Sequence, residues 1–250
     1  MARSTKLERA EAQLEALYRK AEHDLVEQLA DDLERGNLGS ARYRRARIAS
    51  VRELLSELQN EAVPQATDLA TLAYQEGAKQ AVAATGSTLP SFGSGQHLGA
   101  MEMLADNLVS GLNGAAEMVG RRVEDAYRKA GLEAASQQIA QGGTLRDATR
   151  ELIDLLRSQG LNAGPGGAAN WKLSRYAEMV IRTNTTDAIT RGNINTATED
   201  GYDLVEVLAI GDELLCEICG SFVGTIYTLG ERDGYETLTE FPPFHPNCRC

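Results

Sequence analysis

Residues 7–33, LERAEAQLEALYRKAEHDLVEQLADDL, decide the fold class of this chain. Apolar side chains recur here at spacings of three, four and seven residues, with charged side chains between them. This spacing places the apolar side chains on one face of a helix, whereas a half-buried strand would alternate at every second residue. The apolar positions are Leu7, Leu14, Leu17, Ala21, Leu25, Leu29 and Leu33. We therefore expect a long amphipathic helix that packs against other helices.

The residues that follow predict more helices. Gly36 and Ser40 mark a helix end and a new N-cap, so a second helix is expected over about residues 41–62. The short connection predicts an antiparallel hairpin. Pro64 is expected to interrupt the second helix because proline lacks a backbone N–H, and an alanine-rich third helix is expected over 65–84.

Stretches rich in glycine, serine and proline predict two linkers, and helical patterns lie between and after them. Over 173–198 the pattern is again helical, and beyond Gly201 two β-branched stretches, 204–210 and 222–227, predict short strands. The predicted organisation is an N-terminal hairpin and third helix (1–84), a linker (85–99), central helices (100–159), a second linker (160–171), and a C-terminal helix followed by a small cysteine-containing module (172–250).

The composition agrees with helix-on-helix packing. Aromatic residues make up only 5% of the chain and alanine is frequent, whereas a sheet sandwich would be rich in Val, Ile and aromatic residues. No run of eighteen apolar residues occurs and the first residues lack the apolar stretch of a secretory signal, so we expect no membrane span and folding in a reducing cytoplasm. The sequence thus predicts a mainly α protein, an elongated helical body with a small C-terminal α+β cap.

The charge is unevenly distributed along the chain. From Glu199 onward eleven acidic residues face two basic ones, so this segment carries −9 of the net −11. Such a segment is repelled by phosphate backbones. A basic cluster lies far from it in the sequence and could meet DNA phosphates, although such a cluster is more often an exposed helix face. Its members are Arg42, Arg44, Arg45 and Arg47.

All four cysteines and one of the three histidines fall in two short motifs near the end of the chain. The motifs are Cys216-Glu-Ile-Cys219 and His245-Pro-Asn-Cys248-Arg-Cys250, separated by 25 residues. Zinc takes four thiolate or imidazole ligands at tetrahedral corners, and each pair of spaced ligands supplies one edge. The preferred ligand set is Cys216, Cys219, His245 and Cys248. Cys250 is the alternate, since an extended chain would point Cys248 and Cys250 to opposite faces unless a turn after Pro246 intervened.

Other interpretations of the cysteines stay open. Their even number permits two disulfides, which the missing secretory signal and the paired spacing argue against. Cys216 and Cys219 could form a redox pair, but no βαβ context surrounds them. A catalytic zinc would keep an open position beside a general base, whereas five candidate ligands favour a closed structural site. We find no nucleophile and base that would form an active site, and we interpret His23 and His97 as surface residues.

The combined motifs resemble a known family. The C-terminal half of the chain, roughly 140–250, is similar to the Mu F-like minor head proteins of tailed bacteriophages, also called the SPP1-type head morphogenesis family. The matching features are the helix IRTNTTDA at 181–188, Asp212, Cys216, Cys219, Gly224 and the ending PPFHPNCRC at 242–250.

The resemblance implies a structural protein of the virion head and no enzyme. It implies association with the portal protein and with major capsid or scaffold proteins, assembly in the host cytoplasm, and a role in head morphogenesis and in genome packaging or ejection. Some members of the family bind DNA, which makes viral DNA a further partner. The resemblance carries the metal ligands onto Cys216, Cys219, His245 and Cys248, with Cys250 and Asp212 also in the motif, and we expect no fused domain after Cys250.

Overall fold

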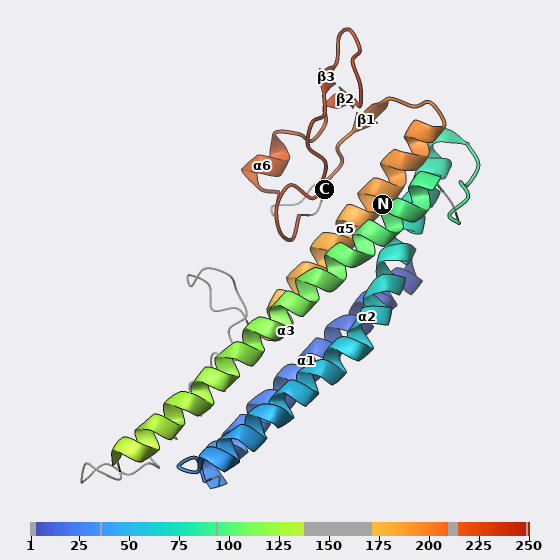
Figure 1. The fold of residues 1–250 in the computed structure, drawn as a ribbon. Coiled ribbons are helices and arrows are strands. Elements are labelled where there is room, and N and C mark those ends of the chain that lie inside the picture. The colour runs from blue at the N-terminus through green and yellow to red at the C-terminus, as the bar shows by residue number, and fades with distance from the viewer. Residues whose placement is uncertain (1–3, 36, 94, 138–171, 210–214, 249) are drawn as a thin grey trace. The chain divides into compact units, whose positions relative to one another are not determined.

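The computed structural model describes residues 4–35, 37–93, 95–137, 172–209, 215–248 and 250 (Figure 1). The described residues are mostly helical, with a small sheet near the C-terminus, which confirms the predicted fold class. None of the described helices is long and apolar enough to cross a membrane. In chain order the elements are α1 (Thr5–Arg35), α2 (Ala41–Thr85), α3 (Gly95–Gln137), α5 (Leu173–Glu199), β1 (Leu204–Glu206), α6 (Glu217–Gly220), β2 (Ile226–Thr228) and β3 (Glu236–Thr237).

The predicted break at Pro64 is wrong, because α2 runs through it from Ala41 to Thr85. Pro64 lies on the exposed face of the helix, while Ala62 and Ala66 on either side are buried. The carbonyl oxygen of Asn60, which loses its partner, lies on the same exposed face and can bond to water, and packing of the buried face outweighs the lost hydrogen bond. α3 also begins earlier than expected, at Gly95 inside the predicted linker. The predicted central helices beyond Gln137 and the linker 160–171 lie outside the described residues, and the domain boundaries stay a prediction.

The chain divides into two compact units, and each long helix contributes to both. Unit 1 consists of Met1–Ala12, Gln65–Val109 and Met179–Cys250, and unit 2 of Gln13–Pro64 and Ser110–Glu178, as far as these ranges are described.

Unit 2 is a helical core closed by buried polar contacts. The predicted apolar stripe is buried at Leu14, Ala21, Leu25 and Leu29, and Leu17 is half-buried. The buried Asp32 of α1 joins three helices: it accepts hydrogen bonds from the hydroxyls of Tyr43 on α2 (2.8 Å) and Tyr127 on α3 (2.5 Å), and it pairs with Arg47 (2.7 Å). A buried carboxylate is stable only with such partners.

Unit 2 also fixes the start of α5. The backbone N–H of Ser174, in the first turn of α5, donates to the carboxylate of Glu22 on α1 at 2.9 Å. A carboxylate at this position satisfies an otherwise unpaired N–H and complements the positive end of the helix dipole.

In unit 1, α2 and α5 approach so closely that only glycine fits at two positions. A Cβ atom on Gly77 would lie 1.9 Å from the carbonyl oxygen of Ile189, and one on Gly192 would lie 2.0 Å from that of Tyr74. The helices are therefore in backbone contact. The buried side chains of α2 in this stretch are mostly small, with Leu69 and Tyr74 as the larger ones; the small ones are Ala66, Ala70, Ala73, Ala78 and Ala81.

The small sheet of unit 1 has the order β1-β2-β3. β1 pairs antiparallel with β2, with Val205 opposite Tyr227, and β2 pairs parallel with β3, with Tyr227 opposite Glu236. The first predicted strand is thus confirmed at its start, whereas the second begins only at Ile226. Val207, Tyr227 and Leu238 form the buried centre of a small core that packs against the cysteine-containing loops.

Candidate metal centre

The first two cysteines are held by one turn of helix. Cys216 is the N-cap of α6, and its sulfur accepts the backbone N–H of Cys219 at 3.4 Å. The helical turn brings the side chains of residues three apart to the same side. Cys216 is half-buried and Cys219 is buried, so the pair points from the edge of the module into its interior.

The second motif forms a tight turn after Pro246. The N–H of Cys248 donates to the carbonyl of His245 at 3.0 Å, and Asn247, the third residue of the turn, has a φ of 60°. Type II turns need a positive φ at this position, and asparagine tolerates it better than most residues. The chain therefore reverses between His245 and Cys248. It is not extended here, so Cys248 and Cys250 can reach one site.

The two motifs meet. The Nε2 atom of His245 lies 3.3 Å from the sulfur of Cys216 and 3.1 Å from that of Cys219, and the sulfurs of Cys219 and Cys248 are 3.6 Å apart. A tetrahedral zinc with Zn–S bonds of about 2.3 Å and Zn–N bonds of about 2.0 Å needs S···S edges of roughly 3.8 Å and S···N edges of roughly 3.5 Å. The donor atoms are thus spaced close to those edges, and the residues fit a metal ion.

Five donors are arranged in two overlapping groups. Cys216, Cys219 and His245 form one group, and Cys219, Cys248 and Cys250 form the other, with ligand atoms within 4.8 Å of one another in each. Cys219 belongs to both. Because Cys248 and Cys250 both lie beside Cys219, the preference for Cys248 over Cys250 stays a prediction. Asp212 lies outside the described residues.

The cysteines are free thiols in this structure. The Cys219–Cys248 sulfur separation of 3.6 Å is far above the roughly 2.0 Å of a disulfide. Burial raises the pKa of Cys219, and it raises the pKa of Cys250 to about 11. The N–H of Cys219 lowers the pKa of Cys216, and backbone N–H bonds lower the pKa of Cys248 against the opposing effect of burial. Some thiols of the cluster thus have a raised pKa and others a lowered one, although all lie close together. A bound cation would favour the thiolate form of each.

The orientation of His245 suits a metal ligand. Its Nδ1 atom lies 2.9 Å from the carbonyl oxygen of Pro246, which can only accept a hydrogen bond, so Nδ1 carries the proton. This bond is the largest contribution to the raised pKa of His245. Nε2, which faces the sulfurs, is left as the atom that would bind an ion, and a fixed tautomer of this kind is typical of metal-bound histidines.

Aromatic packing supports the turn. The rings of Phe244 and Phe222 stack at a centroid distance of 4.2 Å, and both lie against the small core of unit 1. The backbone N–H of Asn247 donates to the hydroxyl of Thr183 on α5 at 3.1 Å. Thr183, in the threonine-rich stretch of α5, thus makes a polar contact with the C-terminal module.

The arginine cluster is partly used inside unit 2. Arg47 pairs with Asp32, and Arg44 donates to the carbonyl oxygen of Leu38. Arg42 and Arg45 are exposed. Two of the four arginines are therefore engaged within the fold, and contact of this cluster with nucleic acid stays a prediction.

The interpretation of His97 as a surface residue is wrong. The side chain is 3% exposed, with Nδ1 2.8 Å from the hydroxyl of Tyr74 and Nε2 2.7 Å from the carboxylate of Glu199. Asn195 donates to the same hydroxyl at 2.9 Å. The linker-like composition around His97 concealed that α3 begins at Gly95 and turns the imidazole into unit 1. His23 is exposed, as expected.

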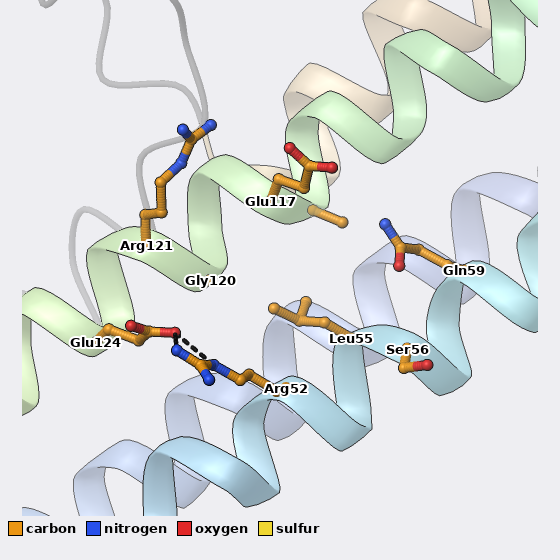
Figure 2. Close-up of a pocket in the computed structure, with 9 residues that line it drawn as sticks. Arg52, Leu55, Ser56, Gln59, Glu117, Gly120, Arg121 and Glu124 are labelled. Atoms are coloured by element: carbon orange, nitrogen blue, oxygen red, sulfur yellow. Dashed lines mark hydrogen bonds and ion pairs between the residues drawn. The ribbon is translucent and has the colours of Figure 1, made fainter. Parts of the chain in front are cut away.

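A groove on unit 2 lies between α2 and α3 (Figure 2). Arg52 and Glu124 bridge it with an ion pair of 2.7 Å, and the groove has a volume of about 280 Å³. The described lining offers the hydroxyl of Ser56 and the carboxylates of Glu117 and Glu124, of which Glu124 is engaged by Arg52, and no contact of Ser56 with a base is observed among the described residues. The groove supports no catalytic assignment. Its lining residues are Arg52, Leu55, Ser56, Gln59, Ala116, Glu117, Gly120, Arg121 and Glu124.

Comparison with known proteins agrees with a structural protein. The family model of phage minor capsid protein 2 matches residues 3–241, nearly the whole chain. The match includes Cys216 and Cys219 and ends before His245. No curated protein and no solved structure matches significantly. The chain belongs to the phage minor capsid protein 2 family, which supports a structural role in a bacteriophage head.

Proposed function

We propose that the protein is a minor, portal-associated component of the phage head, and that a structural zinc ion holds its C-terminal module as a rigid docking surface. The match over residues 3–241 to a minor capsid family carries the head role. The more specific kinship with Mu F-like proteins rests on the motifs at 181–188 and 212–250. Portal, major capsid and scaffold proteins are the proposed partners, and packaging or ejection of the genome is the proposed process.

The proposed zinc site rests on one observation: four sulfurs and one imidazole nitrogen converge in two groups that share Cys219. Three thiolates with one imidazole, or four thiolates, are donor sets of closed structural zinc sites. When bound, zinc would cross-link the turn at α6 to the turn at His245. The module has only a small apolar core around Tyr227, so this cross-link would contribute much of its stability.

Metal removal tests the site. Chelation of the zinc-loaded protein should loosen the C-terminal module and leave most of the far-ultraviolet helical signal, because α1, α2 and α3 contain no ligand. Hydrogen exchange would report the first effect and circular dichroism the second. Cobalt substitution should give the absorption of a tetrahedral thiolate site. Absence of stoichiometric zinc from the purified protein, or an open coordination position in the cobalt spectrum, would count against the closed structural site.

The head role is tested by location. Electron microscopy of procapsids and virions should place a few copies of the chain at the portal vertex, inside the head. Procapsids made without the chain should assemble with altered vertices or fail to retain DNA. Copies distributed evenly over the capsid shell would contradict portal association.

A second role, contact with viral DNA, rests on the exposure of Arg42 and Arg45. Reversal of both charges (Arg42→Glu, Arg45→Glu) should weaken DNA binding and reduce its dependence on salt, since each phosphate contact releases counterions. Arg9→Glu is a matched control, because Arg9 is exposed on α1 and lies outside the cluster. Equal DNA retention by the double variant and the parent would eliminate this role.

A further inference from the structure

We propose that Thr183 on α5 is a positioning residue of the metal centre, which fixes the turn between two of its ligands. The proposal rests on the proposed metal site. The hydroxyl oxygen of Thr183 accepts the backbone N–H of Asn247 at 3.1 Å. Asn247 lies between His245 and Cys248 in the sequence, so the bond acts on the backbone that carries both side chains.

The bond orients the turn. Asn247 is exposed, so water could satisfy its N–H if Thr183 were absent. Water would not hold this N–H in one fixed direction. This N–H belongs to the central peptide of the turn, between Pro246 and Asn247, and it points to the hydroxyl of Thr183 on α5. Thr183 therefore selects one orientation of the turn from those that a solvated turn could sample.

A second contact ties the same segment to the same helix. The guanidinium of Arg191 lies 5.3 Å from the centre of the Phe241 ring, and Asp187 holds that guanidinium at 3.3 Å. Thr183 and Arg191 are eight residues apart on α5, a spacing that puts both on one broad face of a helix, about 12 Å apart along its axis. The segment 241–247, which contains His245 and precedes Cys248, is thus attached to α5 at both of its ends.

This arrangement assigns a structural role to Thr183 in the threonine-rich stretch of α5. A site made of two separate turns binds an ion tightly only if both are oriented beforehand, because otherwise binding must also order the loose one. The turn at α6 is oriented by its own helical hydrogen bonds. The turn at His245 takes part of its orientation from α5. Partners of this kind typically contribute 10- to 100-fold to metal affinity.

The test compares three variants of the full chain. Thr183→Val removes the hydroxyl and keeps the shape, Thr183→Ser keeps the hydroxyl, and Thr190→Val is the matched control. Thr190 is half-buried and lies seven residues further along the same face of α5. Zinc affinity is measured by competition with a chromophoric chelator, and the cobalt-substituted proteins are compared by absorption. Circular dichroism checks that the helices are unchanged.

We expect Thr183→Val to bind zinc about 10-fold or more weakly and to show an altered cobalt spectrum. Thr183→Ser and Thr190→Val should match the parent in both. Parent-like affinity and spectrum in Thr183→Val would overturn the proposal, as would equal losses in Thr183→Val and Thr190→Val. Failure of the proposed zinc site itself would be distinguishable, since the parent chain would then bind no more zinc than Cys219→Ala, which removes the donor that both groups share.

Discussion

Gly192 on α5 provides a sharp test of the packing in unit 1. In Gly192→Ala the new Cβ would lie 2.0 Å from the carbonyl oxygen of Tyr74 and 2.8 Å from its carbonyl carbon. Non-bonded carbon and oxygen atoms need roughly 3.4 Å, so α2 and α5 would have to separate by more than about 1 Å. The obstacle is backbone on both sides, so no side-chain rotation relieves it.

The separation is costly because interiors are close-packed. A gap of 0.5–1 Å forfeits about a quarter to a half of the dispersion energy of each contact along the seam. Overpacking in cores costs about 1–3 kcal/mol and occasionally more, while alanine gains about 1 kcal/mol over glycine in a helix. Since the clash is at backbone, the gross cost should lie above this range, at about 3–4 kcal/mol, which leaves a net loss of about 2–3 kcal/mol. The melting temperature should fall by roughly 5–10 °C for a chain of this length.

Gly99→Ala is the matched control. Gly99 lies in α3, also in unit 1, and is exposed, and a Cβ added there would meet nothing within 4 Å. Only the propensity gain remains, so its melting temperature should rise by about 2–4 °C. Thermal unfolding followed by circular dichroism measures both. If Gly192→Ala were neutral or stabilising like Gly99→Ala, the backbone contact between α2 and α5 would be refuted.

Three further predictions concern polar groups in unit 2. Tyr127→Phe should lower the free energy of unfolding by about 1–2 kcal/mol, because the hydroxyl of Tyr127 donates to Asp32. Tyr18→Phe should be neutral or stabilising, because the buried Tyr18 hydroxyl has no partner among the described residues. Equal losses of the two variants in urea unfolding would contradict this. Burial raises the pKa of both tyrosines above 10, so the fold favours their neutral form. Their contribution to stability is therefore complete below about pH 10 and decreases as the pH rises beyond it. Stability should therefore fall above pH 10, and less so in the double Phe variant. Glu22→Ala should cost about 1 kcal/mol by leaving the N–H of Ser174 unpaired, which the melting temperature at pH 7 would report; no loss would argue against this inter-helix cap.

The helical class was predictable because the signal is local. Leu14, Leu25 and Leu29 repeat at helical spacing, and all are buried. The turn after Pro246 was only an open alternative in the sequence, although proline followed by asparagine suits its backbone angles. The grouping of the cysteines with His245 was predictable because thiol and imidazole pairs at short spacing have few uses other than metal binding.

The features that depend on distant partners were not predictable. Helix continuation through Pro64 depends on the apolar contacts of Ala62 and Ala66, whose burial a propensity argument cannot register. His97 has a polar, glycine-rich neighbourhood, yet Tyr74 and Glu199 enclose it from positions 23 and 102 residues away.

The sequence by itself determined the helical class and the set of possible metal ligands, because periodicity and residue chemistry act over a few neighbours. Only the tertiary structure decided that Gly192 must lack a side chain, that Arg47 pairs with Asp32, and that Thr183 bonds to the turn after His245. Each of these depends on two segments far apart in the chain coming within 4 Å. Such an approach is set by the packing of whole helices, which no short stretch of sequence encodes.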